Sequence, residues 1–126
     1  MALNEDIGEK VLNYFQNSTN NSENSNGHAW RGFIVHATGS VLHPRMNIEN
    51  SSAFNKGPCN ILTLGGRYTI SEDGQVQEHG PLMISISNTN WVVVGGQVIG
   101  RLVAAGNVQV VVFTIRYKPS EDEDEV

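Results

Sequence analysis

The sequence predicts a single β-rich domain with one helix, and three observations lead to this fold class. A chain of 126 residues is the length of one domain, enough to bury about two-thirds of its unfolded surface in one core. Hydrophobic residues make up 39%, charged residues 17% and glycines number 13, which suits a turn-rich sheet better than a helical bundle. Helical spacing of apolar residues occurs once, near the N-terminus, and strand-like runs fill the rest.

The predicted helix begins after Asp6, a residue type that caps helix N-termini. Apolar side chains then recur at helical spacing, at Ile7, Val11, Leu12, Tyr14 and Phe15. Residues 16–28 consist largely of Asn, Ser and other polar types with nothing apolar to bury. We therefore expect a mobile loop there.

A hairpin is predicted next. Residues 32–37 are apolar and partly β-branched, and Thr38-Gly39-Ser40 is a turn signal, so residues 41–48 are expected to return beside the first strand. Pro44 restricts that second strand to a sheet edge or a bulge.

Further strands follow, separated by polar or glycine-containing turns. They are predicted at residues 60–71, 82–87, 91–94, 97–103 and 108–117. Gly65-Gly66 predicts a bend or bulge in the first of them, and Glu72-Asp73-Gly74 predicts the turn after it. Ile84 and Ile86 alternate with Ser85 and Ser87, which predicts a half-buried strand with its serine face toward water. Gly95-Gly96 is expected to separate two strands.

Charge is concentrated in the last residues. The net charge is −5, but residues 121–125 supply five of the 13 acidic groups, which leaves eight acidic against eight basic residues in the body. A neutral body has no basic stripe for phosphates, so we expect no DNA-binding residues in this chain. Residues 119–126 are predicted to be disordered and either solvate the C-terminus or dock a basic partner.

The cellular compartment is predicted from cysteine usage and hydropathy. Cys59 is the only cysteine, and no apolar run behind basic residues resembles a signal peptide, so we expect an intracellular, reducing environment. The longest apolar stretches, residues 91–94 and 108–115, are far shorter than the roughly 20 residues of a membrane span. No membrane segment is expected.

Catalytic chemistry finds no support in the residue pattern. Cys59 adjoins proline and asparagine rather than a base, which favours an inert thiol over a nucleophile. Ser85 and Ser87 alternate along a strand instead of occupying a strand-to-helix elbow. We expect no enzyme activity and no cofactor.

Two other features have a structural and a functional interpretation. Gly95, Gly96 and Gly100 superficially resemble a phosphate-binding loop, but no helix follows, so we interpret them as glycines that allow close strand approach or a bulge. Trp91 is interpreted as a core residue at the start of a strand, with an exposed interface anchor as the alternative.

Residues 83–113 resemble a known family. The matching positions are Gly95, Gly96, Val98, Gly100, Leu102, Ala104, Ala105, Val108, Gln109, Val110, Val111 and Val112. Residues 5–11 and 33–48 extend the likeness, so it covers most of the chain. The sequence resembles the plant-and-prokaryote conserved (PPC) domain of plant AT-hook motif nuclear-localised proteins.

The resemblance implies an α+β fold, an α/β sandwich in which a large, mostly antiparallel sheet packs with one N-terminal helix over residues 1–118. It also implies trimers with itself or with other PPC-domain proteins, contacts with transcription factors and a nuclear location. DNA association in the family depends on a separate basic hook for AT-rich minor grooves. A second implied possibility, drawn from prokaryotic relatives, is a ligand-binding or enzymatic trimer with polar groups converging near Arg67, Gln97 and Arg101.

The sequence departs from the family pattern in several places. No Arg-Gly-Arg-Pro hook occurs in these residues, so DNA contact is expected only through hooks elsewhere or on partner subunits. The family's recruitment motif reads Gly57, Pro58, Cys59, Asn60, Ile61 and Leu62 here, without its arginine, phenylalanine and glutamate. The strand that precedes the family's first helix has no counterpart in residues 1–5, which predicts an unpaired sheet edge.

A metal site is not expected. The positions where prokaryotic relatives place histidines read Pro81, Met83 and Gln97. The histidines present lack ligand spacing; they are His28, His36, His43 and His79. We therefore expect an oligomerising protein-interaction domain of a nuclear transcription regulator.

Overall fold

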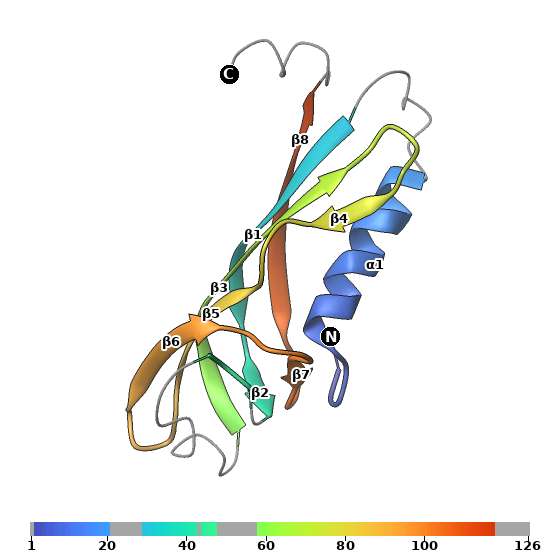
Figure 1. Ribbon diagram of the computed structural model, residues 1–126. Coiled ribbons are helices and arrows are strands. Elements are labelled where there is room, and N and C mark those ends of the chain that lie inside the picture. The colour runs from blue at the N-terminus through green and yellow to red at the C-terminus, as the bar shows by residue number, and fades with distance from the viewer. Residues whose placement is uncertain (1, 21–28, 43, 48–57, 118–126) are drawn as a thin grey trace.

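A computed structural model describes residues 2–20, 29–42, 44–47 and 58–117, and it shows one helix beside one large antiparallel sheet (Figure 1). The elements, in chain order, are α1 (Ile7–Asn20), β1 (Ala29–Thr38), β2 (Ser40–Leu42), β3 (Pro58–Ile70), β4 (Val76–Glu78), β5 (Met83–Ser87), β6 (Val93–Gln97), β7 (Val103–Ala104) and β8 (Gln109–Tyr117). Within the described ranges, no helix has both the length and the apolar character needed to cross a bilayer.

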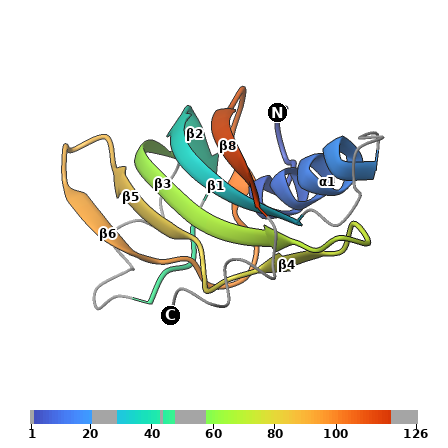
Figure 2. The same ribbon diagram turned by 90° about the horizontal axis from the view of Figure 1, so that it is seen from above.

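The eight strands form one sheet with β3 at its centre. The main strand order is β6-β5-β3-β1-β8, while β2 and β4 pair with β3, and β7 pairs with β2. All of these pairings are antiparallel. Figure 2 shows that α1 lies at one end of this arrangement and that the β5–β6 hairpin lies at the other. The predicted α+β fold class is confirmed.

Helix α1 packs its apolar stripe on the sheet. Ile7, Val11 and Phe15 are buried, and the Phe15 ring lies 4.9 Å from that of Tyr68. The predicted start after Asp6 is confirmed, but the helix continues to Asn20, so the loop expected from residue 16 is wrong for residues 16–20. Phe15 packs this part of the helix on the core. The polar residues that follow can continue the helix, because its backbone hydrogen bonds do not depend on apolar side chains. Residues 21–28 lie outside the described part.

The predicted hairpin is wrong in its partners. Strand β1 is present, but β2 pairs with β3 and β7 instead of returning beside β1, whose neighbours are β3 and β8. Gly39 redirects the chain with a φ of 127°, and its carbonyl accepts a 2.8 Å hydrogen bond from the Ile61 amide. A Cβ at Gly39 would lie 2.6 Å from the Asn107 carbonyl oxygen, so the passage of the chain from β1 to β2 requires glycine at this position. β2 ends at Leu42, before Pro44.

Strand β3 contains the predicted irregularity. Its register against β5 shifts between Ile61 and Thr63, which confirms a bulge, although the shift precedes Gly65-Gly66. The turn at residues 72–74 is also confirmed, with Gly74 at a φ of 89° and the Ser71 amide bonded to the Gln75 carbonyl. It leads into β4, a three-residue strand too short to predict from periodicity.

The β5–β6 hairpin corrects two expectations. Ile84 and Ile86 are buried as predicted, but Ser87 is only 2% exposed, so the serine face does not meet water at that position. Gly95-Gly96 lies inside β6 rather than between two strands. The strand predicted at residues 97–103 is instead a connection to β7, with the Val98 amide bonded to the Leu82 carbonyl.

Candidate interaction surface

The sheet face turned away from α1 carries exposed apolar side chains. In β8, Val110 and Val112 pack on the core, whereas Val111, Phe113 and Ile115 point to the other face and are about half exposed. Residues opposite each other in a ladder share a face, and Phe113 pairs with Phe33, whose ring centroid lies 6.2 Å away. We call this surface the outward face and define it by Val35, Met83, Val93, Val111, Phe113 and Ile115.

Some of the polar groups on the outward face have partners on it. The hydroxyls of Thr63 and Ser85 form a 2.6 Å hydrogen bond between β3 and β5. The Arg31 guanidinium lies 4.6 Å from the centroid of the Tyr117 ring. A partner surface could cover these groups without leaving them unsatisfied, whereas the exposed Arg67 and Gln97 on the same face would need polar partners.

The residues at the family's recruitment motif form the start of β3, and their side chains alternate between the core and the surface. Cys59 is 1% exposed and Ile61 is buried, while Pro58, Asn60 and Leu62 are exposed. Burial raises the pKa of the Cys59 thiol, which disfavours the reactive thiolate. Gly57 lies outside the described part. The side chains that a partner can reach here are those of alternate residues.

Two of the glycines singled out in the sequence, Gly95 and Gly100, differ in what they contribute. A Cβ at Gly95 would lie 3.5 Å from the Ile84 carbonyl oxygen, an ordinary contact. At Gly100 no atom lies within 4 Å of that position, so the close approach we expected is absent there. Its φ of 75° is the reason glycine suits the site.

The positions that correspond to the family's histidines come together, but without metal ligands. Met83 in β5 lies directly opposite Gln97 in β6, and Pro81 precedes Met83 by two residues. His36 and His79 are exposed, whereas His28 and His43 fall outside the described residues. In the described ranges, no group of three His, Cys, Asp or Glu side chains could hold a metal ion.

The three residues proposed to line a ligand site do not converge. Arg67 is opposite Phe33 and Gln97 is opposite Met83, so both belong to the outward face. Arg101 lies beside the N-terminus of α1, where its Nε is 3.8 Å from an Asp6 carboxylate oxygen.

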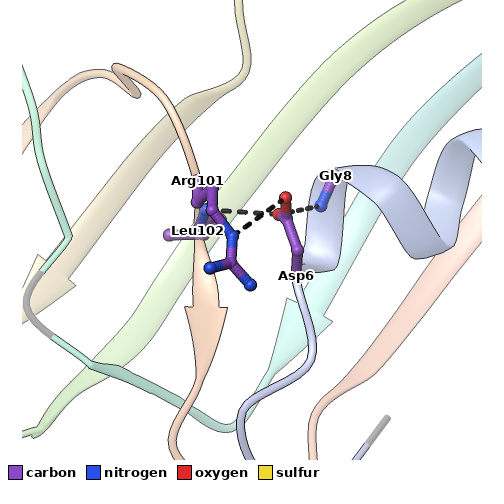
Figure 3. A network of polar contacts seen from close by, with 4 residues as sticks. All are labelled: Asp6, Gly8, Arg101 and Leu102. Carbon is purple, nitrogen blue, oxygen red and sulfur yellow. Dashed lines mark hydrogen bonds and ion pairs between the residues drawn. The ribbon is translucent and has the colours of Figure 1, made fainter.

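Asp6 joins the helix to the connection between β6 and β7 (Figure 3). Its Oδ1 accepts hydrogen bonds from the Gly8 amide at 3.1 Å and from the Leu102 amide at 3.3 Å. The Ile7 amide also bonds to the Leu102 carbonyl at 2.8 Å. These contacts hold the N-terminal end of α1 against the connection between β6 and β7.

Trp91 is exposed, and our core interpretation of it is wrong. The side chain is 83% exposed at the tip of the β5–β6 hairpin. Sequence reasoning placed Trp91 in a strand because Val92, Val93 and Val94 follow it. The signal for a turn was Asn88-Thr89-Asn90 just before it, since asparagine forms turns with its own backbone.

Comparisons with known proteins agree on one family. A model of the Plants and Prokaryotes Conserved (PCC) domain matches residues 4–116. The AT-hook motif nuclear-localized protein 14 of Arabidopsis thaliana is 26% identical over 125 residues, which are 97% of this chain and 28% of that protein. The chain thus spans just over a quarter of the length of this relative.

Solved structures share the fold. A hypothetical protein of Salmonella enterica superimposes with a TM-score of 0.60 at 14% identity, over 89% of this chain and 71% of that one. A candidate DNA-binding protein of Bacteroides thetaiotaomicron gives a TM-score of 0.52 at 14% identity, with the same coverage. At this identity the likeness concerns the fold alone.

Proposed function

Because the chain belongs to the Plants and Prokaryotes Conserved (PCC) domain family, we propose that it is an oligomerising protein-interaction domain of a nuclear transcription regulator. Its proposed partners are further copies of itself and other domains of the family, assembled as trimers. Its relative in Arabidopsis is by name nuclear-localized and carries an AT-hook motif, which supports the location and the setting proposed here.

The observation that carries this proposal is the outward face. Apolar side chains from β1, β5, β6 and β8 lie on one sheet surface, with β3 between β1 and β5, and Phe113 on the terminal strand β8 is 52% exposed. Exposed apolar side chains gathered on one face of a folded domain are typical of an association site. In a closed trimer each copy would meet its neighbours through different parts of this face. The arginines on the face, Arg31 and Arg67, would then lie at the polar rim of the contact, because charged residues are depleted from interface centres.

Association with DNA is proposed to be indirect. The body of the chain has eight acidic and eight basic residues, and its 126 residues contain no Arg-Gly-Arg-Pro segment. Hooks outside these residues or on partner subunits would supply the minor-groove contacts. Assembly would then strengthen DNA binding, because linked hooks act at a high effective concentration.

Transcription factors are proposed as further partners, docking at the exposed residues of the recruitment motif, Pro58, Asn60 and Leu62. These side chains lack the charge pair and the aromatic anchor that strong interfaces use. We expect this contact to be weaker than assembly of the domain.

Light scattering of the purified chain tests the assembly. We expect three times the chain mass, and we expect Phe113→Asp to give monomers because a carboxylate would have to be desolvated in an apolar interface. Leu3→Asp is the matched control, since Leu3 is 59% exposed but lies outside the outward face. Circular dichroism should show both variants folded.

A wild-type chain that stays monomeric at high concentration would contradict the proposal. So would a Phe113→Asp variant that assembles as well as the Leu3→Asp control. The same experiment with a hook-bearing member of the family tests mixed assemblies.

A further inference from the structure

The loop that carries Trp91 is held by its own hydrogen bonds. The Asn88 side-chain oxygen accepts from the amides of Asn90 at 2.9 Å and Val92 at 3.0 Å, and the Asn88 carbonyl accepts from the Trp91 amide at 3.1 Å. Trp91 has a φ of 62°, a left-handed conformation that bulky residues rarely adopt. None of these bonds involves the indole, so the loop holds the Trp91 backbone in place while its large apolar side chain is exposed to solvent.

A cavity of about 440 Å³ opens between the start of α1 and the start of β5. Its apolar lining includes Leu12, Leu82 and Val98. Its acidic lining comes from the exposed Glu9 and Glu78 and from Asp6, whose carboxylate already accepts the hydrogen bonds described above. Apolar walls with a few polar groups are typical of binding sites, and the volume lies in their usual range of roughly 300–1,000 Å³.

The chemistry of the cavity fits an indole. An indole has a large apolar ring and one N–H, which donates a hydrogen bond and cannot accept one. The carboxylates of Glu9 and Glu78 accept hydrogen bonds and, when ionised, cannot donate them. An indole placed against Leu82 and Val98 can therefore bury its ring and direct its N–H toward an acceptor.

Trp91 cannot reach this cavity in its own chain, because it lies at the tip of the β5–β6 hairpin, whereas the cavity lies at the other end of β5, beside α1 (Figures 1 and 2). We propose that Trp91 of one copy inserts into the α1–β5 cavity of the next copy and donates its indole N–H to Glu9 or Glu78. This contact is head-to-tail, the kind that closes into rings. The inference rests on the assembly proposed above and identifies one of its contacts.

Tryptophan fluorescence provides a direct test, because the chain contains only two tryptophans, Trp30 and Trp91. A Trp30→Phe reporter chain retains Trp91 as its only tryptophan. An acceptor chain with both tryptophans changed to phenylalanine has no tryptophan fluorescence. When acceptor is added to dilute reporter, we expect the emission to move to shorter wavelength and iodide quenching to decrease, since the indole leaves water.

A blocked acceptor shows whether the cavity receives the indole. Glu9→Phe in the acceptor places a ring at the cavity while leaving the core untouched, because Glu9 is exposed. We expect this change to weaken reporter binding at least about tenfold, as for loss of an interface anchor. Asn17→Phe is the matched control, since Asn17 is exposed on the same helix but does not line this cavity.

The outcomes separate this inference from the proposed function. An oligomer in which Trp91 remains fully quenchable would overturn the inference and leave the assembly standing. A spectral shift that Glu9→Phe and Asn17→Phe affect equally would also overturn it, because the indole would be buried elsewhere. A chain that stays monomeric, with Trp91 in water, would overturn both.

Discussion

Gly32 lies directly against the ring of Phe15, the contact that seats α1 on the sheet. A Cβ at this position would approach two Phe15 ring carbons to 2.7 Å. The ring is fully buried and packed against Tyr68, so it has no free space to move into. At this residue glycine is required by packing, whereas at Gly100 it is favoured by backbone conformation.

The first prediction compares two glycines. Gly32→Ala should lower the free energy of unfolding by about 1–3 kcal/mol, because the added methyl overpacks the core. Gly65→Ala should be neutral or slightly stabilising, since no atom lies within 4 Å of its Cβ position. Urea denaturation of both variants measures the difference. Equal destabilisation would show that the Phe15 ring does not pack as described.

Tyr68 gives a prediction about alkaline pH. Burial and the nearby Glu78 carboxylate raise the pKa of its phenol to about 12 from an ordinary value of 10. Below pH 10 the phenol is protonated in both states; between pH 10 and 12 the unfolded chain loses this proton and the folded chain keeps it. The free energy of unfolding should therefore fall by roughly 2 kcal/mol across that window.

Tyr68→Phe is the control for this effect, because its ring has no proton to lose. The pH dependence of its unfolding free energy between pH 10 and 12 should be shallower than that of the wild-type chain. Identical slopes would mean that Tyr68 titrates alike in the folded and unfolded chains.

At the scale of elements, the attachment of α1 depends on Asp6. Its carboxylate caps the helix at Gly8 and also accepts from the Leu102 amide. Asp6→Ala should destabilise the chain by about 1–2 kcal/mol, as loss of an N-cap does. Asp6→Asn keeps an oxygen acceptor and should cost much less, because the ion pair with the largely exposed Arg101 is weak. Thermal or urea unfolding measures both, and equal losses would contradict the capping role.

Elements with a clear local signal were predictable from the sequence. Helix α1 has a cap and a regular apolar stripe, and β5 has alternating isoleucines, so both were found. The pairing of the strands was not predictable: β2 is separated from β1 by one residue, yet it pairs with β3 and β7. That outcome depends on Gly39 and on contacts with residues far along the chain, which periodicity does not contain.

At the scale of the whole molecule, the fold class and family were predictable because the frame from Gly95 to Val112 is specific. The exposure of the outward face was not predictable from the sequence. Residues 110–113 form a continuous apolar run in the sequence, and such a run favours a strand covered on both faces. In the structure α1 lies over only one of these faces, so the exposed position of Val111, Phe113 and Ile115 emerged from the placement of the helix.

Strand β8 ends the main strand order, and in the described part of the chain only β1 pairs with it. Its remaining edge runs through Val110-Val111-Val112-Phe113-Thr114-Ile115, which has no proline and no charge. Natural sheets protect such edges, because short apolar segments of high β-propensity stack into cross-β fibrils. The closed assembly proposed above, through side chains, would thus compete with open-ended growth through the backbone of β8. Colloidal stability on storage depends on which of these two routes is faster.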